Sequence, residues 1–514
     1  MSPQRSLLYL FLGTLLVLLA FAPARTWFGD GEEACFAAES WLRTGMPVVA
    51  SASDVSSNIT SNIKAQTRPS MRPLLFTASC VPSVVLAGKP TSGESPPQKL
   101  ARGLIPALWG AGTVVALVSL FAGAGVAPWM SRAFAIATMF STPLWNYSRI
   151  HYSDGIQVLC VILLMVSVAK KRGFMAGLLV GALLNLRTTN ALLAIPVVWA
   201  FWIAPEPGSG GQVNLVKRRS MAMPSFVAGM IPWCVAWAWF NHLRFGAWNI
   251  TGYEDYLVFS GPLTGAWGNL LSPGKSIFLY APLAIAGVIA WCRRVEVMSA
   301  AAFMRTWDAP LVAGVAIILG VASTWWCWSG DWAWGPRMVI PAVPALVLPA
   351  VMRCSAAGPS RRFRVLTLVA CVAGFILQIP VTIIGSHYLT SWGSFVDQQA
   401  FGATPTGGIS IADDLIFAHH VPDFSPLLTQ FQLLGAMGLH GRDYVVDFTA
   451  MAGRFNVPGF KAATGTVAGQ SPDFWFWNTG ASMDSHSYAV AAVLMLLAGV
   501  LMIRRAFASP AGIP

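Results

Sequence analysis

The chain has 514 residues, of which 55% are apolar or aromatic and only 11% are charged. This composition is typical of a polytopic membrane protein and excludes an ordinary soluble domain. The formal net charge is +12, but the lysines and arginines stand in short clusters between apolar runs, so we interpret them as topology signals and expect no nucleic-acid partner.

Twelve apolar segments are predicted to cross the lipid bilayer. In chain order they are residues 6–24, 102–124, 128–146, 155–169, 173–186, 191–203, 221–240, 276–291, 310–327, 338–352, 366–384 and 488–503. The small residues of "AFAPA" leave signal-peptide cleavage after the first segment open, but its apolar core is long and eleven spans follow it. The sequence therefore predicts an all-α polytopic membrane protein with about 12 transmembrane helices.

Basic clusters indicate the direction of these spans. With a cytoplasmic N-terminus, the cytoplasmic connections contain the clusters at 170–172, 217–219, 293–294, 361–364 and 504–505, as the positive-inside rule requires. Treating 173–203 as one helix places three of these clusters outside, so we reject that alternative. The short, proline-bounded run 73–88 is predicted to be interfacial or re-entrant. We expect a multi-pass protein of the cell's inner (cytoplasmic) membrane with both termini cytoplasmic.

This topology divides the chain into three parts. Residues 1–384 form a transmembrane core with a first outer loop at 25–101, residues 385–487 form an extracytoplasmic loop or small subdomain, and residues 488–514 form the last transmembrane helix and a cytoplasmic tail. The loop 385–487 contains glycine and proline throughout. Its histidines, His419 and His420, are adjacent in sequence and so do not share a helix face, which does not favour a metal site.

Polar residues among the apolar runs fall almost entirely on the predicted outer face. They are Asp30, Glu32, Glu33, Asp154, Arg187, Tyr253, Lys275, Asp331 and Arg337. Charges this close to a bilayer are normally paired or line a cavity. The sequence therefore predicts one polar cavity, built by extracytoplasmic loops and open to the outside.

Two kinds of charge are expected in this cavity. Carboxylates such as Asp30 and Asp154 accept protons or bind sugar hydroxyls and metal ions. Arg187, Lys275 and Arg337 are suited to hold a phosphate or pyrophosphate, since arginine offers a forked donor set and lysine a point charge. The tryptophans of "WWCWSGDWAW" add flat apolar surface for a sugar or for the membrane interface.

Structural alternatives remain open for these residues. Asp30 and Asp154 each stand at the expected start of a helix, where an aspartate caps the backbone. Arg187 alternatively forms a structural ion pair. Lys275 and Arg337 alternatively anchor the ends of membrane spans.

The eight cysteines show no CxxC pair and no Cys/His spacing suited to zinc, so no metal framework is predicted. Cys35 and Cys80 form a disulfide if their loop is extracytoplasmic and oxidised, and are otherwise free thiols.

The first-loop pattern "GDGEEACFAAESWLRTG" has an aspartate after the first span, followed by an amphipathic helix. It resembles the GT-C superfamily of glycosyltransferases that use polyprenyl-phosphate sugars, near the bacterial protein O-mannosyltransferase and aminoarabinose-transferase families. "RFGAWNITGY", "LLSPGKSIFLYAPL" and "WCWSGDWAWGPRMVIPAVPAL" are similar to motifs of a bacterial branch of that group. As architecture, the resemblance covers most of residues 1–384.

The resemblance implies that Asp30 is the catalytic base and that Asp154 matches a second acidic residue of many members. Members commonly follow the first aspartate with glutamate, whereas this chain has Gly31, which leaves the roles of Glu32 and Glu33 open. The implied reaction moves a sugar from a polyprenyl-phosphate donor to an extracytoplasmic lipid, glycan or protein. We expect inversion, because no second nucleophile is evident.

In this interpretation Arg337 and Lys275 bind the leaving phosphate, and Asp154 with Arg187 positions the substrates. Glu32, Glu33, Tyr253 and Asp331 are further substrate-binding candidates. The sequence leaves open whether a divalent cation takes part.

A multi-pass transporter or lipid-linked sugar flippase is the main alternative, and a non-catalytic envelope assembly factor is a third. Transporters, however, usually carry charge near mid-membrane and show internal repeats, whereas the charges here concentrate at the outer span ends.

Overall fold

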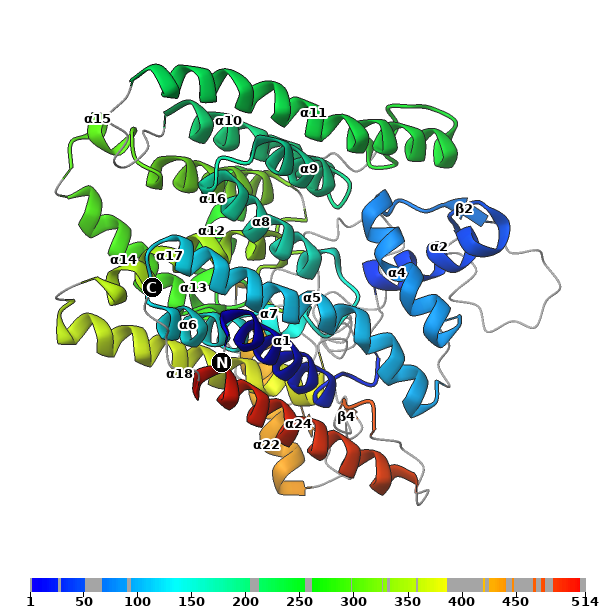
Figure 1. The fold of residues 1–514 in the computed structure, drawn as a ribbon. Helices are drawn as coiled ribbons and strands as arrows, with labels where there is room; N and C mark the ends of the chain where they lie inside the picture. Colours follow the sequence, from blue (N-terminus) through cyan, green and yellow to red (C-terminus); the bar gives the residue numbers. More distant parts are fainter. Residues whose placement is uncertain are drawn as a thin grey trace, which may run out of the picture.

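The structure is a computed structural model of the chain. It describes residues 2–25, 29–50, 67–89, 94–203, 212–254, 261–296, 298–325, 327–330, 333–356, 359–385, 419–420, 425–440, 446–447, 466–467, 473–476 and 484–508. Helices form nearly all of the regular structure in these ranges (Figure 1).

The N-terminal half alternates long helices with short connections. Its elements are α1 (Pro3–Ala20), α2 (Asp30–Thr44), β1 (Val48–Ala50), β2 (Thr67–Pro69), α4 (Leu74–Ala87), α5 (Pro96–Gly123), α6 (Pro128–Phe140), α7 (Leu144–Tyr147), α8 (Ser153–Ala169), α9 (Gly173–Leu184), the 3₁₀ helix η1 (Thr188–Leu193) and α10 (Ala194–Ile203).

The C-terminal half continues this pattern. Its elements are α11 (Gln212–Phe245), α12 (Pro262–Leu271), α13 (Ile277–Tyr280), α14 (Leu283–Val295), α15 (Ala300–Phe303), α16 (Asp308–Thr324), the 3₁₀ helix η3 (Arg337–Ala342), α17 (Val343–Ser355), α18 (Arg361–Ile384), α22 (Pro426–His440), β3 (Val446–Asp447), β4 (Thr466–Val467) and α24 (Asp484–Ala508). The strands pair only as two short antiparallel ribbons, β1 with β2 and β3 with β4.

Each of the twelve predicted apolar segments is helical, so the prediction of an all-α polytopic membrane protein is confirmed. Six helices of the described chain are long and apolar enough to span a bilayer: Pro3–Ala20, Pro96–Gly123, Ala222–Phe245, Arg337–Ser355, Arg361–Ile384 and Ser487–Ala508. Five shorter apolar helices accompany them, at Leu74–Ala87, Ser153–Ala169, Gly173–Leu184, Thr188–Trp202 and Asp308–Thr324.

Proline explains why three predicted spans are broken or tightened. The segment 128–146 divides into α6 and α7 just before Leu144, where Pro143 stands, and 276–291 divides at Pro282 between α13 and α14. Pro341 lies inside η3, the 3₁₀ turn that precedes α17. Proline lacks a backbone donor and clashes with the preceding helical turn, so each position locally favours a break or a tighter turn.

The start of α1 and the end of α24 lie together at one end of the helix bundle. Helices α1 and α24 pack along one another, and the Ser6 hydroxyl and the Arg132 guanidinium both donate to the carbonyl oxygen of Ala506, at 2.8 and 2.7 Å. The start of α1 and the end of α24 are therefore on the same side of the bundle, as the predicted even number of spans requires. Their cytoplasmic location remains a prediction.

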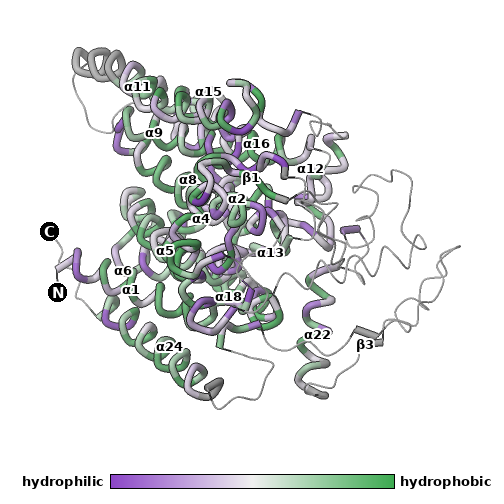
Figure 2. The backbone as a smooth tube through the Cα atoms, turned by 90° about the vertical axis from the view of Figure 1, so that its right-hand side faces the viewer, coloured by the Kyte–Doolittle hydropathy of each residue, from purple (hydrophilic) through white to green (hydrophobic). Residues whose placement is uncertain are grey.

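The opposite end of the bundle carries α2, the β1–β2 ribbon and α4, which stand beside it in Figure 1. Within the run 73–88, Leu74–Ala87 form α4, a 14-residue helix with Pro82 inside it. This helix packs between α2 and α5. In Figure 2 hydrophilic stretches gather around α2 and β1, among helices that are otherwise largely apolar.

Two large apolar clusters hold the bundle together. One joins α5, α8 and α17 through buried residues such as Leu117, Ile162 and Val343, and the other joins α8, α9 and α11 through residues such as Val180 and Phe226. Exposed large apolar side chains instead concentrate on α11, α18 and α24. Because such surfaces are stable against lipid and not against water, these three helices are expected to face the bilayer.

Candidate functional site

Two glycines place Asp30 at the start of α2. Gly29 has φ +53°, a conformation that side-chain-bearing residues rarely adopt. A Cβ on Gly31 would lie 1.8 Å from the carbonyl oxygen of His151, so only glycine allows α2 to approach the segment that leads into α8. The helix start is thereby pressed against the residues that precede Asp154.

Substituting Gly31 by alanine is expected to destabilise the protein by roughly 1–3 kcal/mol, the usual cost of overpacking a tight contact. The reason is that the new methyl group meets backbone, which cannot rotate away. A Gly123→Ala variant is the matched control, because nothing lies within 4 Å of a Cβ at that position. Thermal unfolding of both variants in detergent checks the prediction, and equal midpoints would contradict it.

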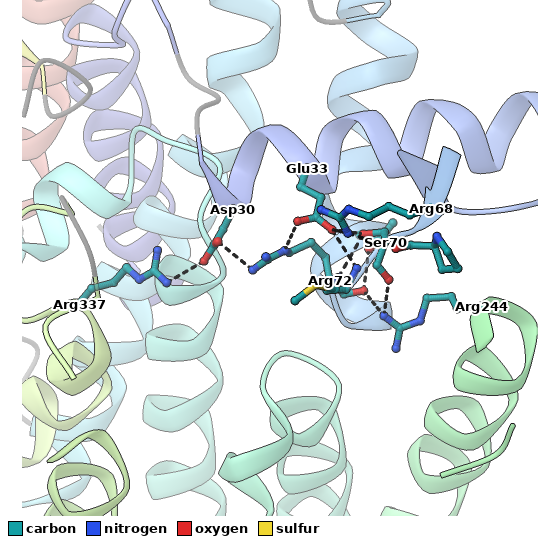
Figure 3. A network of polar contacts seen from close by, with 10 residues as sticks. Asp30, Glu33, Arg68, Ser70, Arg72, Arg244 and Arg337 are labelled. Carbon is teal, nitrogen blue, oxygen red and sulfur yellow. Dashed lines mark hydrogen bonds and ion pairs between the residues drawn. The ribbon is translucent and has the colours of Figure 1, made fainter. Parts of the chain in front are cut away.

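The Asp30 carboxylate lies between two guanidinium groups from distant parts of the chain (Figure 3). Its Oδ2 is 2.7 Å from Nη2 of Arg337, and its Oδ1 is 2.8 Å from Nη1 of Arg72. Gly29, not Asp30, occupies the N-cap position of α2. The carboxylate is therefore engaged by arginines and does not cap the helix, and about a quarter of its side chain is exposed.

Asp154 lies beside this group in the first turn of α8 and is fully buried. Its Oδ1 is 3.6 Å from Nη2 of Arg187, and its Oδ2 is 3.9 Å from Nε of Arg337. Within the described residues neither carboxylate oxygen accepts a hydrogen bond. Arg337 thus bridges the two aspartates, and Asp154 retains acceptor capacity in a buried position, which is unusual in the absence of a ligand.

The Glu33 carboxylate binds the segment that contains Arg72. It is 2.9 Å from Nε of Arg72 and 3.2 Å from Nη1 of Arg68, and it accepts from the backbone N–H of Met71 at 2.9 Å and the hydroxyl of Ser70 at 3.2 Å. With four donors already bound, Glu33 is arranged to position Arg72 more than to contact a substrate.

Arg244, from the end of α11, holds the same segment from below in Figure 3. Its Nη1 donates to the carbonyl oxygens of Ser70 and Arg72, both at 2.9 Å. Sequence reasoning missed Arg68, Arg72 and Arg244. One signal was available: arginines in a predicted outer loop are exceptions to the positive-inside rule, and Arg68 and Arg72 directly precede the segment that becomes α4.

The arginines keep Asp30 and Glu33 ionised. Burial raises the pKa of Asp30, but the positive charges of Arg337, Arg72 and Arg187 outweigh this effect and hold the pKa well below its usual range. For Glu33 the same opposition between burial and Arg72 leaves the pKa lowered. In the state described here Asp30 is therefore a carboxylate whose proton affinity is suppressed by its two partners.

Tyrosines line the arginines on both sides. The Arg337 guanidinium lies 5.0 Å from the centre of the Tyr152 ring, and the Arg72 guanidinium lies 5.9 Å from the centre of the Tyr253 ring. The Tyr253 ring also meets Trp325 edge to face at 6.0 Å. Tyr253 is thus adjacent to the cluster, as the prediction of a substrate-binding role requires.

The other predicted residues are placed differently. Lys275 is fully buried, and its Nζ donates to the carbonyl oxygen of Ala333 at 2.6 Å, so it supports the loop that leads to Arg337. Glu32 lies 3.4 Å from Nη2 of Arg25; burial raises its pKa, with Arg25 opposing the shift. Asp331 and most of the loop 385–487 lie outside the described residues.

One small cavity adjoins the cluster, and a larger one lies beyond it toward the other end of α8. A cavity of about 20 Å³, large enough for a water molecule, is lined by Arg187, Asn190, Leu193, Ile318 and Met338 among others. A second cavity of about 590 Å³ shares Leu193 and Ile318 with the first. It is lined mainly by apolar residues of α5, α8, α10, α16 and α17, with Arg294 and Asp308 among the few charged residues.

The resulting site combines groups of opposite charge. Five guanidinium groups, those of Arg68, Arg72, Arg187, Arg244 and Arg337, surround three carboxylates, those of Asp30, Glu33 and Asp154. Two positive charges are in excess, which favours an anionic ligand. The larger cavity has a mainly apolar lining, and no residue of the charged cluster contributes to it.

No protein-family model and no curated protein match the sequence. Two solved structures are similar to the chain over nearly its whole length. They are ArnT from Cupriavidus metallidurans in the apo state, with a TM-score of 0.42, 14% identity, and 98% of this chain and 78% of that chain covered, and the same protein bound to undecaprenyl phosphate, with a TM-score of 0.43, 12% identity, and 99% and 78% covered.

Proposed function

We propose that this protein is an integral membrane glycosyltransferase of the GT-C type, which moves a sugar from a polyprenyl-phosphate donor to an extracytoplasmic acceptor with inversion. The observation that carries the proposal is the arrangement of Asp30 between Arg72 and Arg337, beside Asp154 and Arg187. In such a site the guanidinium groups suit the phosphate of the donor, and the carboxylates suit hydroxyl groups of the sugar and of the acceptor.

The arginines are proposed to bind the donor phosphate. Arginine pairs with phosphate through parallel hydrogen bonds, and a phosphate entering this site competes with Asp30 for Arg72 and Arg337. When these guanidinium groups turn to the phosphate, the Coulombic effect that suppresses the pKa of Asp30 weakens. Donor binding therefore raises the proton affinity of Asp30 at the moment when a base is needed.

In the proposed reaction Asp30 takes the proton of the acceptor hydroxyl. The acceptor oxygen forms a bond to the anomeric carbon while the bond from that carbon to the phosphate oxygen breaks, and the lipid phosphate leaves with the electron pair. Arg72 and Arg337 stabilise the negative charge that develops on the leaving phosphate. A single displacement with one base inverts the anomeric centre.

Asp154 and Arg187 are proposed to position the substrates. The unused acceptor capacity of Asp154 suits sugar or acceptor hydroxyls, and Arg187 lies between Asp154 and the small cavity. The large apolar cavity shares residues with that small cavity, but its lining extends to Ala169 and Arg294 at the predicted cytoplasmic side, so we do not assign it to the polyprenyl chain. The proposed location is the inner membrane, with the site on the extracytoplasmic side and both termini in the cytoplasm.

A direct assay tests this function. Purified protein in detergent is incubated with a radiolabelled polyprenyl-phosphate sugar and a panel of lipid, glycan and protein acceptors, and free polyprenyl phosphate is measured with the labelled product. Release of lipid phosphate coupled to sugar transfer is expected. Movement of the intact donor across vesicle membranes without bond cleavage would instead show a flippase and contradict the proposal.

Arg72→Gln is expected to weaken the binding of polyprenyl phosphate by about 10–100-fold, since a hydrogen bond to a charged group contributes about 1.5–3 kcal/mol. Binding is measured by titrating polyprenyl phosphate into protein in detergent. Arg43→Gln is the matched control, because Arg43 is an exposed arginine near the end of α2 that pairs with Glu39. Equal affinities for the two variants would remove Arg72 from the phosphate site.

A further inference from the structure

Two cysteines and a histidine from distant parts of the chain lie close together where α2 packs against its neighbours. Cys35 lies in α2, Cys80 in α4, and His151 in the segment before α8, and their ligand atoms all lie within 4.8 Å of one another. The Sγ of Cys80 is 3.9 Å from Nδ1 of His151. Both cysteines are fully buried and His151 is nearly so.

The far side of the His151 ring is held by hydrogen bonds. Its Nε2 lies 3.1 Å from the carbonyl oxygen of Arg102 and 2.8 Å from the hydroxyl of Ser83. A carbonyl only accepts, so the ring proton belongs on Nε2, and the lone pair of Nδ1 then faces the sulfur atoms. Histidines that bind metal ions are oriented in this way by a carbonyl or carboxylate behind the ring.

Arg102, whose carbonyl oxygen contacts His151, is itself held in place by its side chain. Nη2 of Arg102 lies 2.6 Å from the carboxylate of Glu94, and another of its N–H groups donates to the carbonyl oxygen of Gly88 at 3.0 Å. Arg102 and Glu94 are both buried. The contacts of Nε2 therefore hold the imidazole in one orientation, in which Nδ1 faces the two thiols.

Two cysteine sulfurs and an imidazole nitrogen are a common ligand set for zinc. Burial lowers the pKa of His151 to about 4, so the ring is neutral at physiological pH. Contact with Cys35, followed by burial, raises the pKa of the Cys80 thiol. A metal ion that bonds strongly to thiolate would displace the protons of both thiols.

We infer that Cys35, Cys80 and His151 bind a thiolate-preferring metal ion, Zn²⁺ or Cu⁺. Bond lengths of about 2.3 Å to sulfur and about 2.0 Å to nitrogen place these two ligand atoms roughly 3.5–3.8 Å apart around a shared ion, close to the 3.9 Å between Cys80 and His151. Binding would release the two thiol protons. Two thiolates neutralise the charge of Zn²⁺, which suits a buried site.

Such an ion would connect three elements that position the polar cluster. It would connect α2, which begins at Asp30, to α4, whose N-terminus is preceded by Arg72. It would also connect both helices to the segment before α8, the helix that carries Asp154. None of the three ligands is among the residues proposed to act in the transfer, so the proposed role of the ion is structural. The inference concerns a separate site and does not depend on the proposed function.

Metal content and spectroscopy test the inference without an activity assay. The full-length protein is purified under thiol-protecting conditions, stripped with a chelator, and titrated with Zn²⁺ or with Cu⁺ in separate arms; bound metal is then measured by mass spectrometry. About one equivalent is expected to bind. Substitution with Co²⁺ is expected to give the absorption band of sulfur-to-cobalt charge transfer, and binding should raise the unfolding midpoint.

Cys35→Ser, Cys80→Ser and His151→Gln are expected to lower metal affinity by at least 10-fold, whereas Cys292→Ser, which changes an exposed cysteine at the end of α14, should not. If a variant fails to fold, the comparison of stripped and loaded wild-type protein still decides the question. No metal-dependent rise in stability and no charge-transfer band would overturn the inference. A Cys35–Cys80 disulfide in protein isolated without reductant would also overturn it, because it consumes two of the ligands.

Discussion

Asp30→Asn is expected to lower the rate of sugar transfer by about 10²–10⁴-fold, the usual contribution of a positioned general base. Asparagine keeps the size of the side chain and one oxygen that accepts from Arg72 or Arg337, but it does not take a proton from the acceptor. Because Arg72 and Arg337 remain, binding of the donor phosphate should persist. The loss is therefore expected in kcat, with a smaller change in the KM for the donor.

The measurement is the release of polyprenyl phosphate by wild-type and variant protein under identical conditions, together with the affinity for polyprenyl phosphate. Glu39→Gln is the matched control, since it neutralises another carboxylate of α2 whose partner is Arg43. Unfolding midpoints establish that both variants are folded. Turnover by Asp30→Asn within a few fold of wild type would remove Asp30 as the base.

Arg187→Met is expected to destabilise the protein by about 3–5 kcal/mol, the typical cost of removing one partner of a buried ion pair. Asp154 is fully buried, and with Arg187 gone its closest cation is Arg337, whose Nε is 3.9 Å away. The double variant Asp154→Asn with Arg187→Met should recover most of this stability, because no uncompensated buried charge is left.

This double variant separates a structural role of the pair from a functional one. If Asp154 and Arg187 position substrate, the double variant is stable but remains inactive in sugar transfer. Recovery of activity along with stability would show that the pair only supports the fold. The control is Arg43→Met, which breaks the exposed pair with Glu39 and should cost no more than about 0.5 kcal/mol. Denaturant unfolding in detergent and the transfer assay provide the two measurements.

The helices were predictable because their signal is local. A run of apolar residues long enough to cross lipid must satisfy its backbone hydrogen bonds within itself, and a helix does this. The segment 73–88 forms a short helix, as its apolar run allows, and its interfacial or re-entrant placement stays a prediction. The breaks at Pro143 and Pro282 follow from local chemistry as well, although the predicted spans 128–146 and 276–291 ran across them.

The site was only partly predictable. Asp30, Asp154, Arg187 and Arg337 stood out because charge beside an apolar run is costly, and the structure brings these four together. Arg72 was not singled out, although an arginine in a predicted outer loop is an exception to the positive-inside rule. The prediction that Lys275 binds the leaving group, which remains untested, rested on its motif, whereas its contact with Ala333 is a feature of the folded chain.

The sequence by itself determined that this chain is a helical membrane protein with its unusual charges near span ends, because apolar length and the cost of charge are properties of individual segments. Only the tertiary structure decided which charges meet: the contacts of Asp30 with Arg72 and Arg337, and the group of Cys35, Cys80 and His151, join residues tens to hundreds of positions apart. Spacing along the chain carries no record of such contacts, since they depend on how α2, α4 and the start of α8 pack together.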